Sequence, residues 1–287
     1  MISDITGVVV LYFPDKEELF RNISSYIEHL AVLYVIDNTG PKSGDSIYEK
    51  LSNFQKIQVI KNTKNEGIAK ALNKAAESAF SKGFKWLLTM DQDSFFESDE
   101  GNRYFSFFYE NFINKDNIAV VAPAHFKEMI DSTTIYSDLN AVLTSGNLIR
   151  LSVWNEINGF DEKLFIDEVD HDYCYRVKKA GYRIVQVNTI FLNHRLGTKT
   201  KGGYLGSISK RLRTIHTPQR VYFMVRNYLY VRKKYKRDFE KEFGKRDKAL
   251  LVAIKNNLFF SGEFWANFRS IMKAYKDYRA NNFSQTI

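Results

Sequence analysis

The sequence predicts an α/β fold with a mostly parallel central sheet, flanked by helices and followed by a helical extension. Three observations lead to this fold class. Short apolar runs alternate with stretches of helical periodicity between residues 6 and 90. Polar clusters at Asp37, Asn65 and Asp91 follow three of the apolar runs. The charge then changes along the chain, because residues 195–287 hold 22 Lys and Arg against 6 Asp and Glu.

The elements of the first part follow in order. An apolar run at residues 6–13 is typical of a buried strand, and Pro14 with Asp15 marks the start of a helix that reaches about residue 30. Gly67 precedes a helix whose apolar residues recur at helical spacing through residue 79. The other strands of this part are predicted at residues 31–36, 57–60 and 86–90.

The second part begins with strands predicted at residues 119–123 and 141–149. Residues 165–176 enter a helix that ends near Gly181, and residues 183–187 and 191–194 return as strands. The Gly- and Lys-rich residues 199–206 are typical of a mobile loop. From about Thr217 the chain is helical, basic and aromatic, which predicts a domain at residues 1–216 and an extension at residues 217–287.

The composition limits the class of protein. A chain of 287 residues, of which 44% are hydrophobic and 15% aromatic, is large enough to fill the core of one domain with an appendage. The single cysteine, Cys174, excludes an internal disulfide and a cysteine-based metal site. The N-terminus lacks the pattern of a signal peptide, and no run of 18 apolar residues predicts a transmembrane helix. These features predict a cytoplasmic protein.

The polar clusters predict a ligand site at one edge of the sheet. In an open α/β sheet, ligands bind at the carboxyl ends of parallel strands, so the clusters at Asp37, Asn65 and Asp91 face this edge. Asp91 and Asp93, separated by one residue, provide the oxygen ligands that Mg²⁺ or Mn²⁺ needs when it bridges a diphosphate. The alternative is that both carboxylates cap a turn. Gly67 allows a tight turn in which the backbone approaches a ligand closely.

Several motifs occur together in one order along the chain. They are the first strand with Tyr12, Asp37-Asn38, Asn65-Glu66-Gly67-Ile68-Ala69, Met90-Asp91-Gln92-Asp93-Ser94, Thr144-Ser145-Gly146-Asn147, Gly159-Phe160-Asp161, the segment Phe165 to Asp170, and His194. Over roughly residues 5–235 the chain resembles a family 2 glycosyltransferase of the GT-A fold, and most closely the bacterial rhamnosyltransferase-type members. The resemblance implies that residues 1–216 are the catalytic domain.

The resemblance implies an inverting displacement at the anomeric carbon of a nucleotide sugar. Such a reaction needs a divalent metal to stabilise the leaving diphosphate, a base for the acceptor hydroxyl, and both reactants held in line. The metal, Mg²⁺ or Mn²⁺, would be bound directly by Asp93, with Asp91 on the donor ribose or the metal and Gln92 beside the donor. His194 would lie near metal and diphosphate, with a partly buried structural histidine as the alternative.

The base implied by the resemblance is Asp170. Arg176, six residues further on, supports this alignment, whereas Val169 departs from the glutamate that commonly precedes the base. Asp167, Glu168 and Asp172 compete for the role. The alternative for all of these carboxylates is an acidic first helical turn, which the helix dipole favours.

The remaining contacts concern the two substrates. Tyr12 and Asp37 resemble nucleobase contacts, and Asn65 and Gly67 would lie beside the donor. Lys70 reaches a phosphate or is solvated. On the acceptor side, the floor of the cleft would be lined by Ser145, Gly146 and Asn147. Trp154 either packs in the core, which the sequence favours, or stacks on a sugar.

The motifs around Asn65 and Asp91 resemble those of enzymes that use dTDP-L-rhamnose. A related group uses UDP-galactofuranose or another UDP-sugar, and the residues do not separate the two. The expected acceptor is a saccharide or lipid-linked saccharide of bacterial surface polysaccharide synthesis.

The basic extension predicts an amphipathic surface. Its apolar residues follow near-helical spacing among Lys and Arg, at Ile254, Leu258, Trp265, Phe268, Met272 and Tyr275. Such helices lie on anionic membranes, which would make the protein peripheral on the inner face of the cell membrane. The alternatives are a helix pair that packs within the chain or one that forms a homodimer.

Two other functions compete with glycosyl transfer. The basic, aromatic extension is also compatible with a nucleic-acid-binding protein. However, residues 1–194 hold 20 basic against 27 acidic residues and carry the ordered motifs, so no nucleic-acid partner is expected. A glycoside hydrolase would need two carboxylates, which Asp91, Asp93 and Asp170 contain, but the Asp-x-Asp spacing fits that chemistry poorly.

Overall fold

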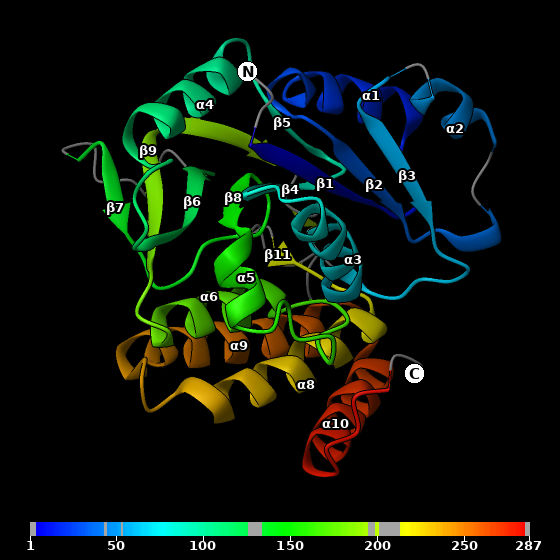
Figure 1. The fold of residues 1–287 in the computed structure, drawn as a ribbon. Helices are drawn as coiled ribbons and strands as arrows, with labels where there is room; N and C mark the ends of the chain where they lie inside the picture. The colour runs from blue at the N-terminus through cyan, green and yellow to red at the C-terminus, as the bar shows by residue number, and fades with distance from the viewer. Residues whose placement is uncertain are drawn as a thin grey trace. The chain divides into compact units, whose positions relative to one another are not determined.

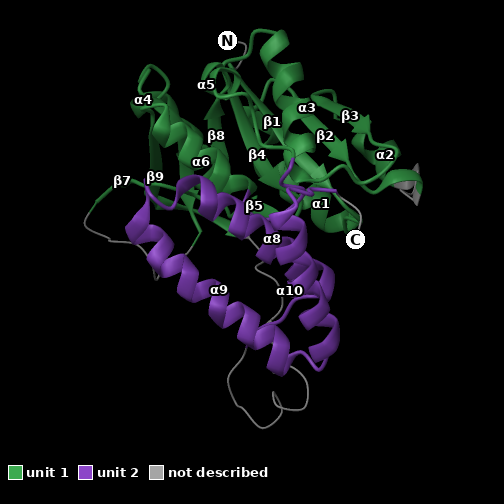
Figure 2. Cartoon of the chain, turned by 90° about the horizontal axis from the view of Figure 1, so that it is seen from below, with its two compact units in different colours: residues 1–162, 169–195 green, residues 163–168, 196–287 purple. Residues whose placement is uncertain are grey.

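The computed structural model describes residues 4–42, 45–52, 54–125, 134–194, 199–200 and 213–284. The chain divides into two compact units, coloured separately in Figure 2. The first contains Met1–Glu162 and Val169–Arg195, and the second contains Lys163–Glu168 and Leu196–Ile287. The predicted end of the catalytic domain at residue 216 stays a prediction.

The first unit is built on a mixed sheet with helices on both faces (Figure 1). The strand order is β3-β2-β1-β4-β8-β6-β9-β5, and β7 pairs with β9. The strands are β1 (Ile5–Leu11), β2 (Leu33–Asp37), β3 (Ile57–Lys61), β4 (Trp86–Asp91), β5 (Ser94–Phe96), β6 (Ile118–Ala124), β7 (Tyr136–Asp138), β8 (Asn147–Arg150) and β9 (Arg183–His194). β1 to β4 run parallel, as predicted, whereas β8 runs antiparallel to both β4 and β6.

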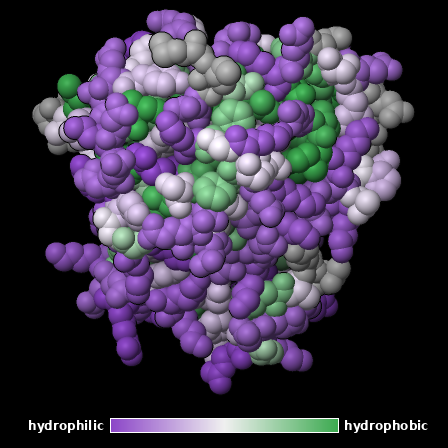
Figure 3. Space-filling view, in the orientation of Figure 1, coloured by the Kyte–Doolittle hydropathy of each residue, from purple (hydrophilic) through white to green (hydrophobic). Residues whose placement is uncertain are grey.

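The helices of this unit cover the sheet in two layers. Figure 1 shows α1 (Lys16–Ser24) and α4 (Glu100–Asn111) on one face and α3 (Ile68–Ser81) and α5 (Leu151–Glu156) on the other. The remaining helices are α2 (Asp45–Leu51), α6 (Val169–Lys179) and the short 3₁₀ turns η1 (Ile27–His29) and η2 (Gly40–Lys42). Hydrophilic residues cover most of the surface seen in Figure 3.

The alternation of side chains along β1 explains the two layers. Ile5, Val9 and Leu11 belong to the core cluster that also contains the buried residues of α1 and α4. Because successive side chains of a strand point to opposite faces, Val8 and Val10 face the other layer. There α3 buries small residues, Ala69, Ala71, Leu72, Ala75, Ala76 and Ala79, which allow close approach to the sheet.

The structure differs from the sequence prediction at several places, and two of these differences have local causes. The helix after Asp15 ends at Ser24, where the hydroxyls of Ser24 and Ser25 donate to the carbonyls of Phe20 and Asn22 and compete with the helical hydrogen bonds. The strand predicted at 141–149 is confined to β8, since Gly146 has a φ of +85°.

Two further differences lie on either side of α6. Residues 165–168 are not helical, because Asp167 and Glu168 have left-handed φ values of +62° and +65°, and α6 begins at Val169. The strand predicted at residues 183–187 continues through residues 191–194 as one strand, β9. The helix α4 was not predicted, although its buried Tyr104, Phe105 and Phe108 recur at helical spacing.

The second unit is mainly helical. It contains α8 (Pro218–Tyr235), α9 (Glu240–Phe260) and α10 (Phe264–Arg279), and a short antiparallel pair, β10 (Lys199–Thr200) with β11 (Arg213–Thr214). Thr217 caps α8 by accepting a hydrogen bond from the backbone N–H of Arg220 at 3.3 Å. The core of this unit joins Val221, Tyr222, Phe223 and Val225 of α8 to Ala274 of α10, with Ile254 of α9 packed against it.

The structure bears on two predictions, the apolar helical series of the extension and the loop before it. The apolar series from Ile254 to Tyr275 does not lie on one helix, because Gly262, with a φ of +83°, separates α9 from α10. Of the loop predicted at 199–206, the first two residues form β10, and residues 201–206 lie outside the described residues. Within the described ranges, no helix has both the length and the apolar character needed to cross a membrane.

Candidate active site

The ends of the parallel strands place the predicted donor residues along one edge of the sheet. The register aligns Leu11 with Asp37 and Val10 with Asp91. Tyr12, which follows β1 directly, therefore lies between the ends of β2 and β4. The register confirms that Asp37 and Asp91 lie at the same edge of the sheet.

Gln92 holds the backbone of Tyr12 beside the end of β4. Its Oε1 accepts a hydrogen bond from the Tyr12 N–H at 2.8 Å, and its Nε2 donates to the Tyr12 carbonyl at 3.1 Å. The Gln92 carbonyl in turn accepts from Asn22 Nδ2 at 2.9 Å. Tyr12 is 52% exposed, and its ring packs edge-to-face with that of Phe13 at a centroid distance of 4.8 Å.

Asp37 is buried at the end of β2, and its partners include two hydrogen-bond donors. Its Oδ1 accepts from the Thr39 N–H at 2.7 Å, and its Oδ2 accepts from the hydroxyl of Tyr48. The Nζ of Lys61 lies 3.3 Å from the centroid of the Tyr48 ring. Sequence reasoning missed Tyr48, which lies eleven residues away on α2.

The turn before α3 is fixed by side-chain amides. Asn65 Oδ1 accepts from the Gly67 N–H at 2.9 Å, and Gly67 has a φ of +84° that favours glycine. Asn38, directly after β2, donates from Nδ2 to the Gly67 carbonyl at 3.1 Å. Its Oδ1 accepts from Asn62 at 2.7 Å. The turn is thereby tied to the end of β2.

Lys70 is engaged within this turn. Its Nζ lies 2.9 Å from Oε1 of Glu66, which also pairs with Lys74. Burial alone would raise the pKa of Glu66, but the hydrogen bonds from Lys74 and Lys70 outweigh burial and hold the pKa below its usual value. The pairing with Glu66 raises the pKa of Lys70. The structure thus gives Lys70 a partner inside the protein.

Asp91 and Asp93 lie half-buried at the end of β4. The Asp91 N–H donates to Ser145 Oγ at 3.0 Å, which anchors the strand end. The pairing of β5 with β9 sets Ser94 opposite His194, so the main chain of His194 lies across from the residue after Asp93. The side chain of His194 lies outside the described residues.

The three residues predicted on the acceptor side are packed against β4. The side chains of Ser145 and Asn147 are only 2% and 5% exposed. The Gly146 N–H donates to Thr89 at 2.7 Å, and its carbonyl accepts from the Tyr104 hydroxyl at 2.9 Å. These contacts hold the backbone at the end of β4. The roles of these residues toward an acceptor stay a prediction.

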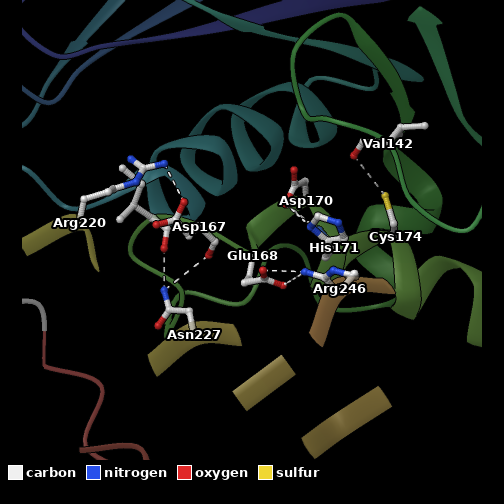
Figure 4. Close-up of polar contacts among 10 residues, drawn as sticks. Val142, Asp167, Glu168, Asp170, His171, Cys174, Arg220, Asn227 and Arg246 are labelled. Atoms are coloured by element: carbon white, nitrogen blue, oxygen red, sulfur yellow. Dashed lines mark hydrogen bonds and ion pairs between the residues drawn. The ribbon is translucent and has the colours of Figure 1, made fainter. Parts of the chain in front are cut away.

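Asp170 lies in the first turn of α6 and is 19% exposed (Figure 4). Its Oδ1 accepts from the His171 N–H at 2.8 Å and lies 3.0 Å from His171 Nδ1. One imidazole therefore orients this carboxylate. Sequence reasoning missed His171, because side chains at successive positions of a helix usually point in different directions.

The competing carboxylate Asp172 has a structural partner. It is fully buried, and its Oδ2 accepts from Arg176 Nε at 2.8 Å. The Nη1 of Arg176 donates to the carbonyls of Ile157 at 2.7 Å and Gly159 at 2.5 Å. A buried charge needs such pairing, so Asp172 holds α6 to the preceding loop.

The other two carboxylates are paired within the second unit. Asp167 Oδ1 lies 2.7 Å from Arg220 Nη2, and Glu168 Oε1 lies 2.6 Å from Arg246 Nη2 (Figure 4). Both side chains thus stabilise the left-handed backbone of residues 167–168. Among the four carboxylates of this segment, Asp170 is the one whose described hydrogen bonds are to a histidine.

A sequence model of the glycosyl transferase family 2 matches residues 8–175, which include Tyr12, Asp91, Asp93 and Asp170. The chain belongs to glycosyl transferase family 2. It is therefore a glycosyltransferase, as the motifs predicted.

The sequence of one bacterial protein agrees with this assignment to family 2, and solved structures are similar in fold. The chain is 29% identical over 250 residues to dTDP-rhamnosyl transferase RfbF of Shigella flexneri, with 81% of each protein covered. It is similar to GalNAc-T7, solved with UDP, GalNAc and Mn²⁺, with a TM-score of 0.60, 16% identity, and coverage of 84% of this chain and 49% of that one.

A second structure is the mannosyltransferase PcManGT of Pyrobaculum calidifontis with GDP-Man and Mn²⁺. Its TM-score is 0.59 at 14% identity, with 100% of this chain and 77% of that chain covered. At these identities the likeness shows the fold, which is GT-A. The predicted fold class is confirmed.

The carboxylates at the end of β4 are suited to a metal ion that is bound jointly by the protein and by substrate phosphates. Within the described ranges, no group of three His, Cys, Asp or Glu side chains gathers into a metal-binding cage. A Mg²⁺ ion that binds substrate phosphates commonly takes only one or two carboxylates from the protein. Asp91 and Asp93, neighbours at the strand end, fit that requirement.

Asn73 of α3 is a positioning residue that the sequence did not reveal. Its Oδ1 accepts from the N–H of Phe160 at 2.8 Å and from Trp154 Nε1 at 3.2 Å, and its Nδ2 donates to the Phe160 carbonyl at 2.9 Å. Arg176 binds the adjacent Gly159 carbonyl. The loop 159–160 therefore joins α3, which follows the donor turn, to α6, which carries Asp170. Trp154 is only 8% exposed, so it packs in the core.

Proposed function

We propose that the protein transfers L-rhamnose from dTDP-L-rhamnose, with inversion, to a saccharide or lipid-linked saccharide of bacterial surface polysaccharide synthesis. The observation that carries the choice of donor is the similarity to dTDP-rhamnosyl transferase RfbF, which extends over 81% of both chains. The similarity is one of sequence and extends over 250 residues, which supports a common donor as well as a common fold.

The sheet edge supports a nucleotide at this place. The exposed ring of Tyr12 would flank the thymine, and Asp37 would accept the N3–H of the base. The turn at Asn65 and Gly67 would bring backbone close to the donor. Gln92 serves the donor indirectly, because it holds Tyr12 in place.

Asp93, with Asp91 and His194, would hold a divalent ion, Mg²⁺ or Mn²⁺, against the diphosphate. The bound ion supplies Lewis-acid stabilisation of the negative charge on the leaving group. His is compatible with either ion, so the donor set does not decide between them.

Asp170 would remove the proton from the acceptor hydroxyl. The arrangement of the four carboxylates supports this role, since Asp167, Glu168 and Asp172 are bound by arginines. His171 orients Asp170 through Oδ1. A positioned carboxylate of this kind is an effective general base.

The kind of acceptor determines whether the enzyme has to work at a membrane. If the acceptor is linked to a lipid, the enzyme must reach the cytoplasmic face of the membrane, and we propose that the basic C-terminal helices provide this contact. Residues 195–287 carry 22 basic against 6 acidic residues, which favours an anionic surface.

A thermal-shift panel tests the donor. Purified protein is screened with dTDP, UDP, GDP and CDP, each with and without Mg²⁺ or Mn²⁺. We expect dTDP with metal to stabilise the protein by about 2.7 kcal/mol at a hundredfold excess over its Kd. Asp93→Ala should abolish this shift, whereas Asp99→Ala, at an exposed position six residues away, should leave it unchanged.

A response to UDP in place of dTDP would overturn rhamnose and favour galactofuranose or another UDP-sugar. No response to any nucleotide with either metal would overturn the donor site. Turnover of dTDP-L-rhamnose then checks the reaction directly, and NMR of the product checks the inverted anomeric configuration.

A further inference from the structure

We propose that the outer face of α10, together with the end of α9, docks onto an anionic lipid surface. The inference names the surface for the membrane contact proposed above, and it rests on the proposed function only for the location of the acceptor. The surface, called the α10 face below, is defined by Trp265, Phe268, Met272 and Tyr275 with the neighbouring basic residues.

The apolar part of the α10 face forms one exposed row. Trp265, Phe268, Met272 and Tyr275 follow the spacing i, i+3, i+7 and i+10, which lines up side chains on one side of a helix. Their exposed fractions are 69%, 42%, 52% and 48%. The opposite side of α10 buries Ala274, which packs with the core residues of α8. The row therefore points away from α8.

A basic row runs beside the apolar one. Arg269, Lys273 and Lys276 follow the spacing i, i+4 and i+7, and Arg279 continues it. The single carboxylate between residues 264 and 279 is Asp277, which is 8% exposed and bound by Lys273 at 2.8 Å. Among the described residues, Arg269, Lys276 and Arg279 form no ion pair. The α10 face therefore carries uncompensated positive charge.

The end of α9 extends the same surface. Phe259 is 50% exposed, and no carboxylate occurs between Lys248 and Ser261. The rings of Phe259 and Phe264 lie 5.8 Å apart, which joins α9 to the start of α10 across Gly262. In the part of Figure 3 where Figure 1 draws α10, apolar side chains show among hydrophilic ones.

This combination matches a lipid surface better than the alternatives. Exposed tryptophan and phenylalanine beside Lys and Arg are typical of helices that lie in the headgroup region. A nucleic acid would not need the exposed aliphatic side chain of Met272. A two-fold homodimer through this face would bring together two surfaces of the same positive charge, and Asp277, the one carboxylate between residues 264 and 279, is already bound by Lys273.

The test uses full-length protein and vesicles of phosphatidylcholine alone or with phosphatidylglycerol. We expect co-sedimentation with the anionic vesicles only, weakened by salt, and a blue shift of tryptophan emission. Trp265 would dominate that shift, because Trp86 and Trp154 are 0% and 8% exposed. The double variant W265S/F268S should lower the partition coefficient by about tenfold or more.

The controls separate this proposal from the proposed function. Phe80→Ser removes an aromatic side chain of 40% exposure from α3 and should leave vesicle binding unchanged. The charge variant R269E/K276E should abolish the preference for anionic lipid. In all variants the nucleotide thermal shift should persist, so a failed donor test and a failed docking test give different results.

Two outcomes would overturn the docking proposal. The first is equal sedimentation of wild type and W265S/F268S with anionic vesicles, or no sedimentation of either. The second is a dimer by light scattering that W265S/F268S converts to a monomer, which would assign the α10 face to a second copy of the chain.

Discussion

At the scale of single residues, the segment 167–172 holds four carboxylates whose partners differ. Asp172 is sealed against Arg176, whereas Asp170 is partly exposed and faces a histidine. Proximity in sequence made them equivalent candidates, and only the partners distinguish them. A group that must accept a proton has to be reachable, and a fully buried, ion-paired carboxylate is not.

Replacing Asp170 tests its role as the base. We expect Asp170→Asn to lower kcat by about 10²- to 10⁴-fold, because the amide cannot take up the proton. The stabilisation by nucleotide and metal should be unchanged, since the variant alters no donor contact. Kinetics with dTDP-L-rhamnose and thermal shifts measure both.

The matched control is Asp172→Asn. It leaves the Arg176 charge without its buried partner, so we expect a loss of about 3 kcal/mol in the free energy of unfolding. Normal turnover by Asp170→Asn would show that another group is the base.

His171 is expected to act through Asp170. His171→Ala removes the contact of 3.0 Å to Asp170 Oδ1 and should lower kcat by about tenfold, with the donor KM unchanged. His171→Asn retains an N–H donor and should recover part of kcat. A purely structural role would instead lower the melting temperature of both variants and leave kcat of the folded protein intact.

At the scale of elements, the loop 159–160 joins α3 to α6. Gly159 has a φ of +66°, and a Cβ at this position would lie 2.7 Å from Asn73 Oδ1 and 3.0 Å from Trp154 Nε1. Glycine at position 159 therefore permits both the left-handed backbone and the close approach of Asn73. This loop connects α3, the helix after the donor turn, with α6, the helix that carries Asp170.

Gly159→Ala is predicted to destabilise the protein by about 2–4 kcal/mol, from backbone strain and from overpacking against Asn73 and Trp154. Gly181→Ala is the matched control, because Gly181 has a φ of +90° and nothing lies within 4 Å of its added Cβ. It should cost about 1 kcal/mol, from strain alone. Urea unfolding at pH 7 measures both, and equal losses would contradict a specific role for the contact with Asn73.

At the scale of the whole molecule, charge and ionisation are distributed unevenly. Residues 195–287 are strongly basic, whereas the first 194 residues have an acidic excess. Both parts nevertheless contain carboxylates whose pKa is held below its usual value by hydrogen bonds from basic side chains. They are Glu66, Asp138, Asp247 and Asp277. The free energy of unfolding should therefore decrease as the pH is lowered.

Acid is predicted to destabilise the folded chain. A carboxyl with a lowered folded pKa contributes stability above its unfolded pKa, about 3.9 for Asp and 4.3 for Glu, and loses it as the pH falls through the folded pKa. Burial lowers the pKa of His29 and His216, so their contribution declines earlier, as the pH falls below about 6.5. Urea unfolding from pH 8 to pH 3 measures the decline.

Asp277→Asn should flatten the acid part of this curve. For Asp277, burial alone would raise the pKa, but hydrogen bonds from Lys273 and Tyr222 outweigh it. The variant should lose stability at pH 7 and converge with wild type at pH 3. A constant difference across the whole range would contradict the linkage.

Much of the fold was predictable because its signals are local. The apolar runs, the caps and the polar residues at strand ends lie within a few residues of each other, and they sufficed for β1 to β4, α3 and the sheet edge. The antiparallel β8, the early end of the helix after Asp15, and the break at Gly262 were not predicted. Each depends on backbone angles or pairing that the apolar pattern does not encode.

The sequence by itself determined the family, the GT-A fold and the clustering of Tyr12, Asp37 and Asp91 at one sheet edge. Parallel strands of similar length bring their carboxyl ends together whatever else the chain does. Only the tertiary structure decided which carboxylate is structural, what holds Tyr12 and Asp37, and that Asn73 joins α3 to α6. Those answers depend on hydrogen-bond partners far apart in the chain, such as Asn73 with Phe160, which become neighbours only when the chain is folded.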